Sequence, residues 1–169
     1  MKKTIKIPFK NYITLIVLFL IVIFSYSWIL KIYRVNKITQ SSVLTNNIAI
    51  ISVNDLNDYI IENPNTIIYL PTLIKTNNEF ENKFLELILN NHYEEKIVYL
   101  NIGGASYKKI KERIFTDYSD NSSIFDDEFA TLLLIKDGRI VNSLLIKEGY
   151  EFRFVAKFIS DGEEVLNND

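Results

Sequence analysis

Cysteine is absent from this chain of 169 residues, and histidine occurs only once. Without cysteine there can be no disulfide bond, no thiolate nucleophile and no cysteine-ligated metal. A catalytic histidine needs a partner, and a zinc site usually needs several nitrogen or sulfur ligands, which the single His92 cannot supply. We therefore interpret His92 as a capping or surface residue at the end of a helix, and we predict neither a metal nor a cofactor.

Charged residues are missing between Asn11 and Leu30, a stretch made mostly of Ile, Leu, Val and Phe. A helix of roughly 20 apolar residues is long enough to cross about 30 Å of hydrocarbon. A buried helix of a soluble protein would show a polar face, and this segment has none. Tyr12 and Trp28 lie near its two ends, where aromatic rings favour the headgroup region. The sequence therefore predicts one transmembrane helix over residues 11–31, in contact with the lipid bilayer.

Basic residues on the two sides of this segment predict its orientation. Four lysines lie in the preceding tail (residues 1–10), and three basic residues follow, at positions 31, 34 and 37. The excess favours a cytoplasmic N-terminus, with the rest of the chain outside the cell membrane. The alternative is a cleaved signal peptide, but its apolar core would exceed the usual length of roughly 7–15 residues, and bulky residues would follow the small ones at Ser25–Ser27. We therefore predict a retained anchor.

Acidic residues are absent before position 55. All 21 of them follow the anchor, together with the remaining 15 of the 19 basic residues, so the outer part of the chain has an excess of six acidic residues. A nucleic-acid-binding protein needs a basic face to engage phosphates, and we exclude that class. An outer domain would also face an oxidising compartment, where the lack of cysteine is informative.

The pattern after the anchor predicts a linker (32–47), one α/β domain (48–160) and a flexible acidic tail (161–169). Short β-branched apolar runs predict strands, and amphipathic runs predict helices. The predicted elements are a strand at 48–51, a helix capped by Ser52, a strand at 66–70, a helix at 78–92, a strand at 97–102, a helix at 107–115, strands at 131–135 and 139–146 joined at Asp137–Gly138, and a helix at 151–160. We assign Glu81 to the polar side of the helix at 78–92. This order predicts a central mixed sheet flanked by helices.

Three segments of this pattern resemble the thioredoxin fold. The first is T-I-I-Y-L-P-T at Thr66–Thr72, followed by a long helix; the second is T-L-L-L-I-K-D-G-R-I-V at Thr131–Val141; the third is the amphipathic helix after Gly149. The resemblance covers about Ser52–Ser160 and implies a thioredoxin-like domain. The Y-L-P-T junction in a short anchored chain is also similar to thioredoxin-like accessory proteins of bacteriocin export.

The residues that carry redox chemistry in that family are missing. The family places Cys-x-x-Cys at this strand-to-helix junction, where the helix dipole lowers the pKa of the first thiol. In the nearest register, Leu73 and Thr76 take the two cysteine positions. Ala130, before Thr131, takes the position of the family's cis-proline, and we expect a trans bond there because a non-proline cis bond costs about 2.5–4 kcal/mol. Thiol–disulfide exchange is therefore excluded.

Three further clusters have both a functional and an ordinary interpretation. Asp126–Glu128 offers carboxylates to Ca²⁺ but lacks the ligand spacing of a dedicated loop, so we interpret it as a solvated turn. Gly103–Gly104 lacks the rest of a phosphate-binding motif and is interpreted as a turn. The helix at 107–115 has a basic face that can contact anionic lipid or a partner, or simply face solvent: Lys108, Lys109, Lys111 and Arg113.

The resemblance leads to a function hypothesis without catalysis. We expect a membrane-anchored, extracytoplasmic accessory module that contacts a protein or peptide partner during secretion or assembly of exported peptides or proteins. Thioredoxin-like proteins bind extended chains in a groove that would here comprise Pro71, Thr72, Thr76 and Ala130. Two alternatives remain: an enzyme that uses hydroxyl or carboxylate chemistry in that groove, and a passive membrane-tethered scaffold. A deep pocket with convergent polar groups would favour the enzyme, and a shallow apolar groove would favour binding.

Overall fold

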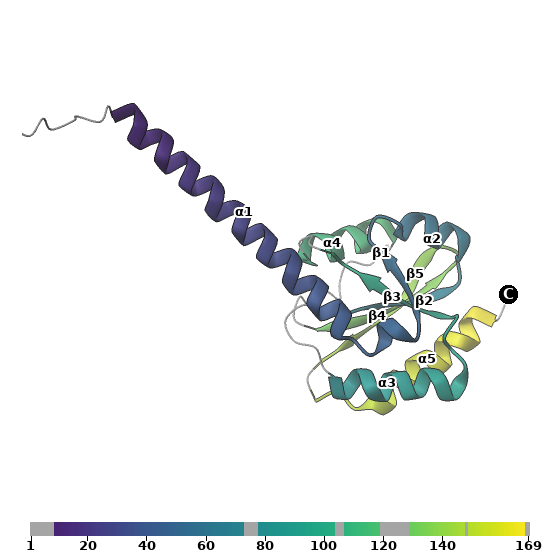
Figure 1. Cartoon of the computed structure of the whole chain (residues 1–169). Helices are drawn as coiled ribbons and strands as arrows, with labels where there is room; N and C mark the ends of the chain where they lie inside the picture. The colour runs from purple at the N-terminus through teal and green to yellow at the C-terminus, as the bar shows by residue number, and fades with distance from the viewer. Residues whose placement is uncertain (1–8, 73–77, 104–106, 119–128, 148, 168–169) are drawn as a thin grey trace, which may run out of the picture.

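One long N-terminal helix leads into a five-stranded α/β domain (Figure 1). The computed structural model describes residues 9–72, 78–103, 107–118, 129–147 and 149–167. The elements in chain order are α1 (Phe9–Ser41), the 3₁₀ helix η1 (Leu44–Asn46), β1 (Ala49–Ser52), α2 (Leu56–Glu62), β2 (Thr66–Leu70), α3 (Asn78–Asn91), β3 (Ile97–Asn101), α4 (Tyr107–Tyr118), β4 (Ala130–Lys136), β5 (Arg139–Ile146) and α5 (Phe152–Asn167).

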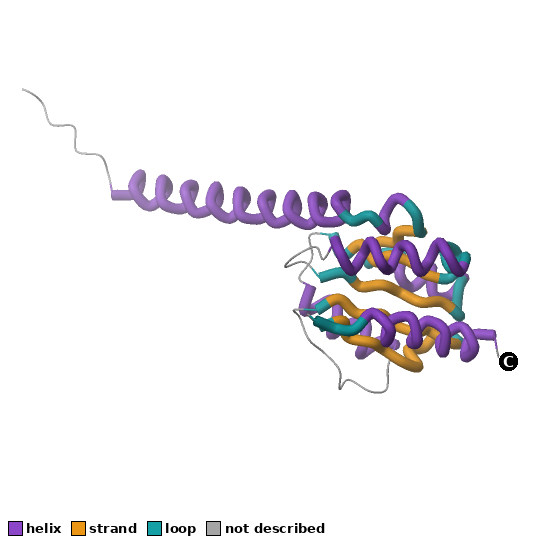
Figure 2. Tube along the Cα trace, turned by 90° about the horizontal axis from the view of Figure 1, so that it is seen from below, coloured by secondary structure: helices purple, strands orange, loops and turns teal. Residues whose placement is uncertain are grey.

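Helix α1 projects from the domain as one continuous helix of 33 residues (Figures 1 and 2). Its segment Asn11–Leu30 is long and apolar enough to cross a membrane, and the side chains of this segment are exposed throughout. The helix continues to Ser41, whereas the sequence predicts a linker from residue 32, with helix to about Asn36. Residues 31–47 contain neither glycine nor proline, so nothing in the local sequence ends the helix earlier.

The five strands form one mixed sheet in the order β1-β3-β2-β4-β5. Strands β1 and β2 run parallel to β3, β4 is antiparallel to β2, and β5 is antiparallel to β4. The hairpin between β4 and β5 turns at Asp137 and Gly138, whose φ angles of 53° and 73° are the positive values that a tight two-residue hairpin requires. The predicted mixed sheet and its hairpin are confirmed.

Helices cover both faces of this sheet (Figures 1 and 2). Helices α3 and α5 pack on one face, in a core that includes Phe84 and Val155. Helices α2 and α4 pack on the other face, in a core that includes Leu56 and Ile110. All five residues of β2 are buried. Because successive strand residues point to opposite faces, Ile67 and Tyr69 belong to the first core, and Ile68 and Leu70 to the second.

The start of α2 differs from the prediction. Ser52 does not cap that helix, because it is the last residue of β1. Its hydroxyl donates a hydrogen bond to Asp55 Oδ2 at 2.6 Å and accepts one from the Asp55 N–H at 3.3 Å. This closed turn delays the helix, which begins at Leu56. Helix α4 likewise ends at Tyr118, beyond the predicted end at residue 115.

The predicted flexible tail from residue 161 is wrong as far as Asn167, because α5 continues to that residue. Gly162 lies so close to β4 that an added Cβ would be 3.1 Å from Leu134 Cδ1. Glu163 forms an ion pair with Lys96, and the Lys136 ammonium donates a hydrogen bond to the Val165 carbonyl at 2.9 Å. These contacts attach the end of the helix to the sheet.

Candidate functional site

The strand register brings part of the predicted groove to one end of the sheet. Leu70, the last residue of β2, pairs with Thr131 on β4. The next residue of each strand is therefore at the same level, which places Pro71 beside Ala130. Ala130 also pairs with Ile146, the last residue of β5. Pro71, Ala130 and Ile146 thus lie at the same edge of the sheet, where β2 and β5 end and β4 begins.

These groove residues are less exposed than the sequence suggests. Pro71 is buried, Thr72 is half-buried, and Ala130 is only 7% exposed. Leu73 and Thr76, the positions that correspond to the cysteines, lie outside the described residues. Within the described residues, Ala130 included, no peptide bond is cis. The described groove residues therefore form the floor of this end of the sheet and present little side-chain surface of their own.

Lys111 on α4 is buried, which corrects its assignment to a basic surface face. Its side chain is 1% exposed, and its ammonium donates a hydrogen bond to the Phe129 carbonyl at 3.1 Å. Phe129 immediately precedes Ala130, so this lysine ties α4 to the start of β4. A buried ammonium needs such partners, because burying an unpaired charge is costly. Its role in the fold is to position the backbone at the edge of the groove floor.

A pocket adjoins this end of the sheet. Its volume is about 370 Å³, within the range of about 300–1,000 Å³ for ligand pockets. It is lined by the start of α3 (Glu79, Phe80 and Lys83) and by the stretch from the end of β5 to the start of α5 (Ile146, Lys147 and Gly149–Phe152). The aromatic rings of Phe80 and Phe152 lie 6.0 Å apart between centroids, which gives the pocket an apolar wall. Ile146 lines the pocket and pairs with Ala130, so the pocket lies beside the groove floor, on its β5 side.

Most charges around the pocket are neutralised by neighbours on the same helix or turn. Glu79 accepts a hydrogen bond from the Lys83 ammonium at 2.8 Å, and this contact lowers the pKa of Glu79. Glu151 forms an ion pair with Arg153. Lys147 is exposed and has no ion-pair partner among the described residues. Within the described residues, the pocket therefore combines an aromatic wall with an exposed lysine at its rim that has no ion-pair partner there.

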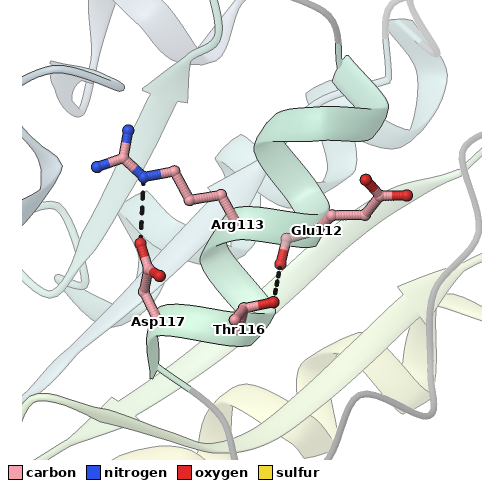
Figure 3. Close-up of polar contacts among 4 residues, drawn as sticks. All are labelled: Glu112, Arg113, Thr116 and Asp117. Carbon is pink, nitrogen blue, oxygen red and sulfur yellow. Dashed lines mark hydrogen bonds and ion pairs between the residues drawn. The ribbon is translucent and has the colours of Figure 1, made fainter.

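Two other sequence candidates are ordinary surface features. His92 is exposed directly after α3, with a positive φ of 56°, so it lies at the helix C-terminus as predicted. On α4, Arg113 donates to Asp117 Oδ2 at 3.1 Å, and the Thr116 hydroxyl donates to the Glu112 carbonyl at 2.9 Å (Figure 3). These bonds stay within the helix and leave Arg113 paired.

A catalytic or metal-binding role would require particular groups among the described residues of the pocket and its surroundings. Among the described residues that line the pocket there is no serine, threonine, cysteine or histidine, so these residues do not supply the hydroxyl–base pair that acyl transfer uses. In the part of the chain that the structure describes, no group of three or more His, Cys, Asp or Glu residues could hold a metal ion. Asp126–Glu128, the candidate calcium ligands, lie outside those residues.

The chain was compared with known proteins by sequence. No protein-family model matches it, and no curated protein sequence is significantly similar to it.

Sequence reasoning missed the pocket, because its two walls are about 65 residues apart in the chain. The one available signal was the cluster of aromatic residues around the start of the last helix, at Tyr150, Phe152 and Phe154. Phe154 is exposed and its ring contacts that of Tyr150 in a tilted arrangement, at 5.5 Å between centroids, so only part of this cluster belongs to the core.

Proposed function

We propose that this protein is a membrane-anchored binding module with a thioredoxin-like outer domain that has no redox activity. The strand order β1-β3-β2-β4-β5, with a parallel half, an antiparallel half and two helices on each face, supports the thioredoxin-like assignment. The absence of cysteine means that thiol chemistry is not its function.

The apolar segment of α1 supports the anchor. It fits a membrane span in length and composition, and none of the described residues covers its exposed side chains. The lysine-rich tail before it favours a cytoplasmic N-terminus, which places the α/β domain outside the cell. In that location the protein acts as an accessory in the export or assembly of peptides or proteins.

The observation that carries the binding role is the pocket beside the groove floor. An extended polypeptide that crosses Ala130 reaches Ile146 and can place one bulky apolar side chain in the pocket, against the wall formed by Phe80 and Phe152. Lys147 favours an acidic group next to that side chain, because the other charges at the rim already have partners. The ligand class is therefore an extended peptide with an aromatic or aliphatic residue beside Asp, Glu or a terminal carboxylate.

A panel of fluorescent extended peptides of this composition, titrated against the full-length protein in nanodiscs, tests the proposal by fluorescence polarisation. We expect Lys147→Glu to weaken binding about tenfold, since removal of one good polar contact costs roughly 1–2 kcal/mol. Phe80→Ala should weaken it at least as much. Lys157→Glu and Leu89→Ala, which change exposed residues elsewhere on α5 and α3, serve as controls. The proposal fails if no peptide binds, or if the pocket variants bind as well as the controls.

A further inference from the structure

The connection between α1 and the domain is buried rather than loose. Ser42 directly follows α1 and is 1% exposed, and Leu44 in η1 is fully buried in the core beside α3. The Leu44 N–H donates a hydrogen bond to the Ser42 hydroxyl at 3.3 Å, and the Thr45 hydroxyl donates to the Ser42 carbonyl at 2.9 Å. The chain therefore enters the core of the domain within three residues of the helix end, with no flexible segment between them.

A buried carboxylate lies at this junction. Glu81 is on α3, one turn before Phe84, and it is only 3% exposed. The Tyr69 hydroxyl of β2 donates a hydrogen bond to Glu81 Oε1 at 3.4 Å. The Ser42 hydroxyl and the Val43 N–H, which directly follow α1, also donate to this carboxylate. Burial raises the pKa of Glu81, and these three hydrogen bonds oppose that rise.

The carboxylate is costly at this position. Oε2 has no hydrogen-bond partner among the described residues, and no described cation forms an ion pair with Glu81. The nearest charged residues along α3, Glu79 and Lys83, are exposed and paired with each other. A buried acid that lacks a counter-ion lowers the stability of a fold, so its presence needs a compensating role. Here the Glu81 carboxylate accepts hydrogen bonds both from the residues that directly follow α1 and from Tyr69 of the sheet.

Glu81 and Tyr69 also adjoin a residue that lines the pocket. Phe80, next to Glu81, lines the pocket, and its ring stacks against Tyr69 at 6.4 Å between centroids. Tyr69 in turn donates to Glu81. The end of α1, Glu81, Tyr69 and the pocket wall are thus in continuous contact. Beyond the apolar segment, Lys31–Ser41 adds only about 16 Å of helix before this junction.

We propose that Glu81 locks the end of α1 to the outer domain, so that both move as one body and the pocket is presented in a fixed orientation to a partner embedded in the same bilayer. The membrane part of this inference rests on the proposed function, whereas the lock itself does not depend on any ligand. Glu81 acts as a positioning residue, because it touches the end of α1 and the support of the pocket but does not line the pocket. Partners that reach the pocket must then lie close to the membrane surface.

The natural absence of cysteine makes the lock directly measurable. Lys37→Cys on α1 and Asn90→Cys on α3, both exposed, give two spin-label sites in the full-length protein without a competing thiol. Double electron–electron resonance in nanodiscs then reports the distribution of the distance between α1 and the domain. We expect a narrow distribution with Glu81 present, and loss of the narrow peak in Glu81→Leu, which cannot accept the three hydrogen bonds.

Two further variants separate the lock from a general loss of structure. Glu81→Gln keeps an acceptor oxygen and should restore the narrow distribution. Glu79→Leu changes an exposed residue two positions away and should leave it unchanged. A broad distribution in the parent protein, or a narrow one in Glu81→Leu, overturns the proposal. Because no peptide is present, this result is independent of the titration that tests the binding function.

Discussion

Two apolar stretches of this chain have opposite surroundings. The segment Asn11–Leu30 exposes every side chain, whereas β2 buries all five of its residues and β4 buries six of seven. Both are runs of aliphatic and aromatic residues, so composition does not separate them. The two segments differ in how their backbone hydrogen bonds are made. A helix of twenty residues pairs its own N–H and C=O groups and can lie in lipid, whereas a short strand needs neighbouring strands to pair them. The same side-chain chemistry therefore gives a helix long and apolar enough to span a membrane in one place and a buried core in the other.

The prediction with the largest expected effect concerns an apolar residue of the buried core. Phe84 is fully buried, and its ring lies 5.5 Å from that of Tyr69 between centroids. Phe84→Ala should lower the free energy of unfolding of the domain by about 3–5 kcal/mol, because it leaves a cavity. Chemical denaturation of the full-length protein, followed by circular dichroism, measures this loss. Phe24→Ala in α1, where the side chain is 73% exposed, should leave the unfolding free energy of the domain unchanged. Equal effects of the two variants would contradict the contrast.

A second prediction concerns the exposed apolar segment of α1 and its insertion into the membrane. Leu18→Arg places a charge near the middle of the apolar segment, where insertion then costs about 2.5–3.5 kcal/mol. We expect a reduced fraction of the protein in the membrane after fractionation, with the denaturation of the domain unaffected. Leu89→Arg, at an exposed site on α3, is the matched control and should remain in the membrane. Full membrane retention of the Leu18→Arg protein would argue against a single anchor.

The smallest expected effect concerns two glutamates on α3, one buried without a counter-ion among the described residues and one exposed and paired with a lysine. The pKa of Glu81 is raised above the ordinary value of 4.5, so its contribution to stability is present below that pH and is lost as the pH rises through the folded-state pKa. Glu81→Gln should therefore be more stable than the parent protein at neutral pH, and this gain should shrink on acidification towards pH 4.5.

Glu79 provides a control with the opposite sign. Its pKa is lowered by Lys83, so its contribution is present above pH 4.5 and is lost as the pH falls through the folded-state pKa. Glu79→Gln should therefore lose a little stability at neutral pH, and this loss should vanish in acid. Denaturation of both variants between pH 3 and about pH 8 compares the two signs. The same pH dependence for both would contradict the difference in burial.

The elements of the domain were largely predictable from the sequence. The strands at Thr66–Leu70 and Ile97–Asn101 and the hairpin at Asp137–Gly138 carry local signals: short apolar runs and a turn that needs positive φ. The end of α5 was not predictable in the same way. It depends on contacts of Gly162 and Glu163 with residues of the sheet that are distant in sequence.

The candidate site was less predictable than the fold. Glu81 was assigned to the polar side of its helix because it is charged, yet its spacing from Phe84 and Ile88, at i+3 and i+7, places it on the buried stripe. Lys111 on α4 was misassigned in the same way. In both predictions, the charge of the residue was given more weight than its position on the helix. Each buried side chain has a hydrogen-bond partner, which offsets part of the cost of burying it.

The sequence by itself determined the apolar segment, the alternation of strands and helices, and the exclusion of thiol chemistry, because each follows from composition or local periodicity. Only the tertiary structure decided that α1 enters the core through Ser42 and Leu44, that Glu81 lies against this junction, and that α3 and the β5–α5 connection enclose a pocket. These features depend on contacts between segments far apart in the chain, and the free energy of such contacts has no local signature.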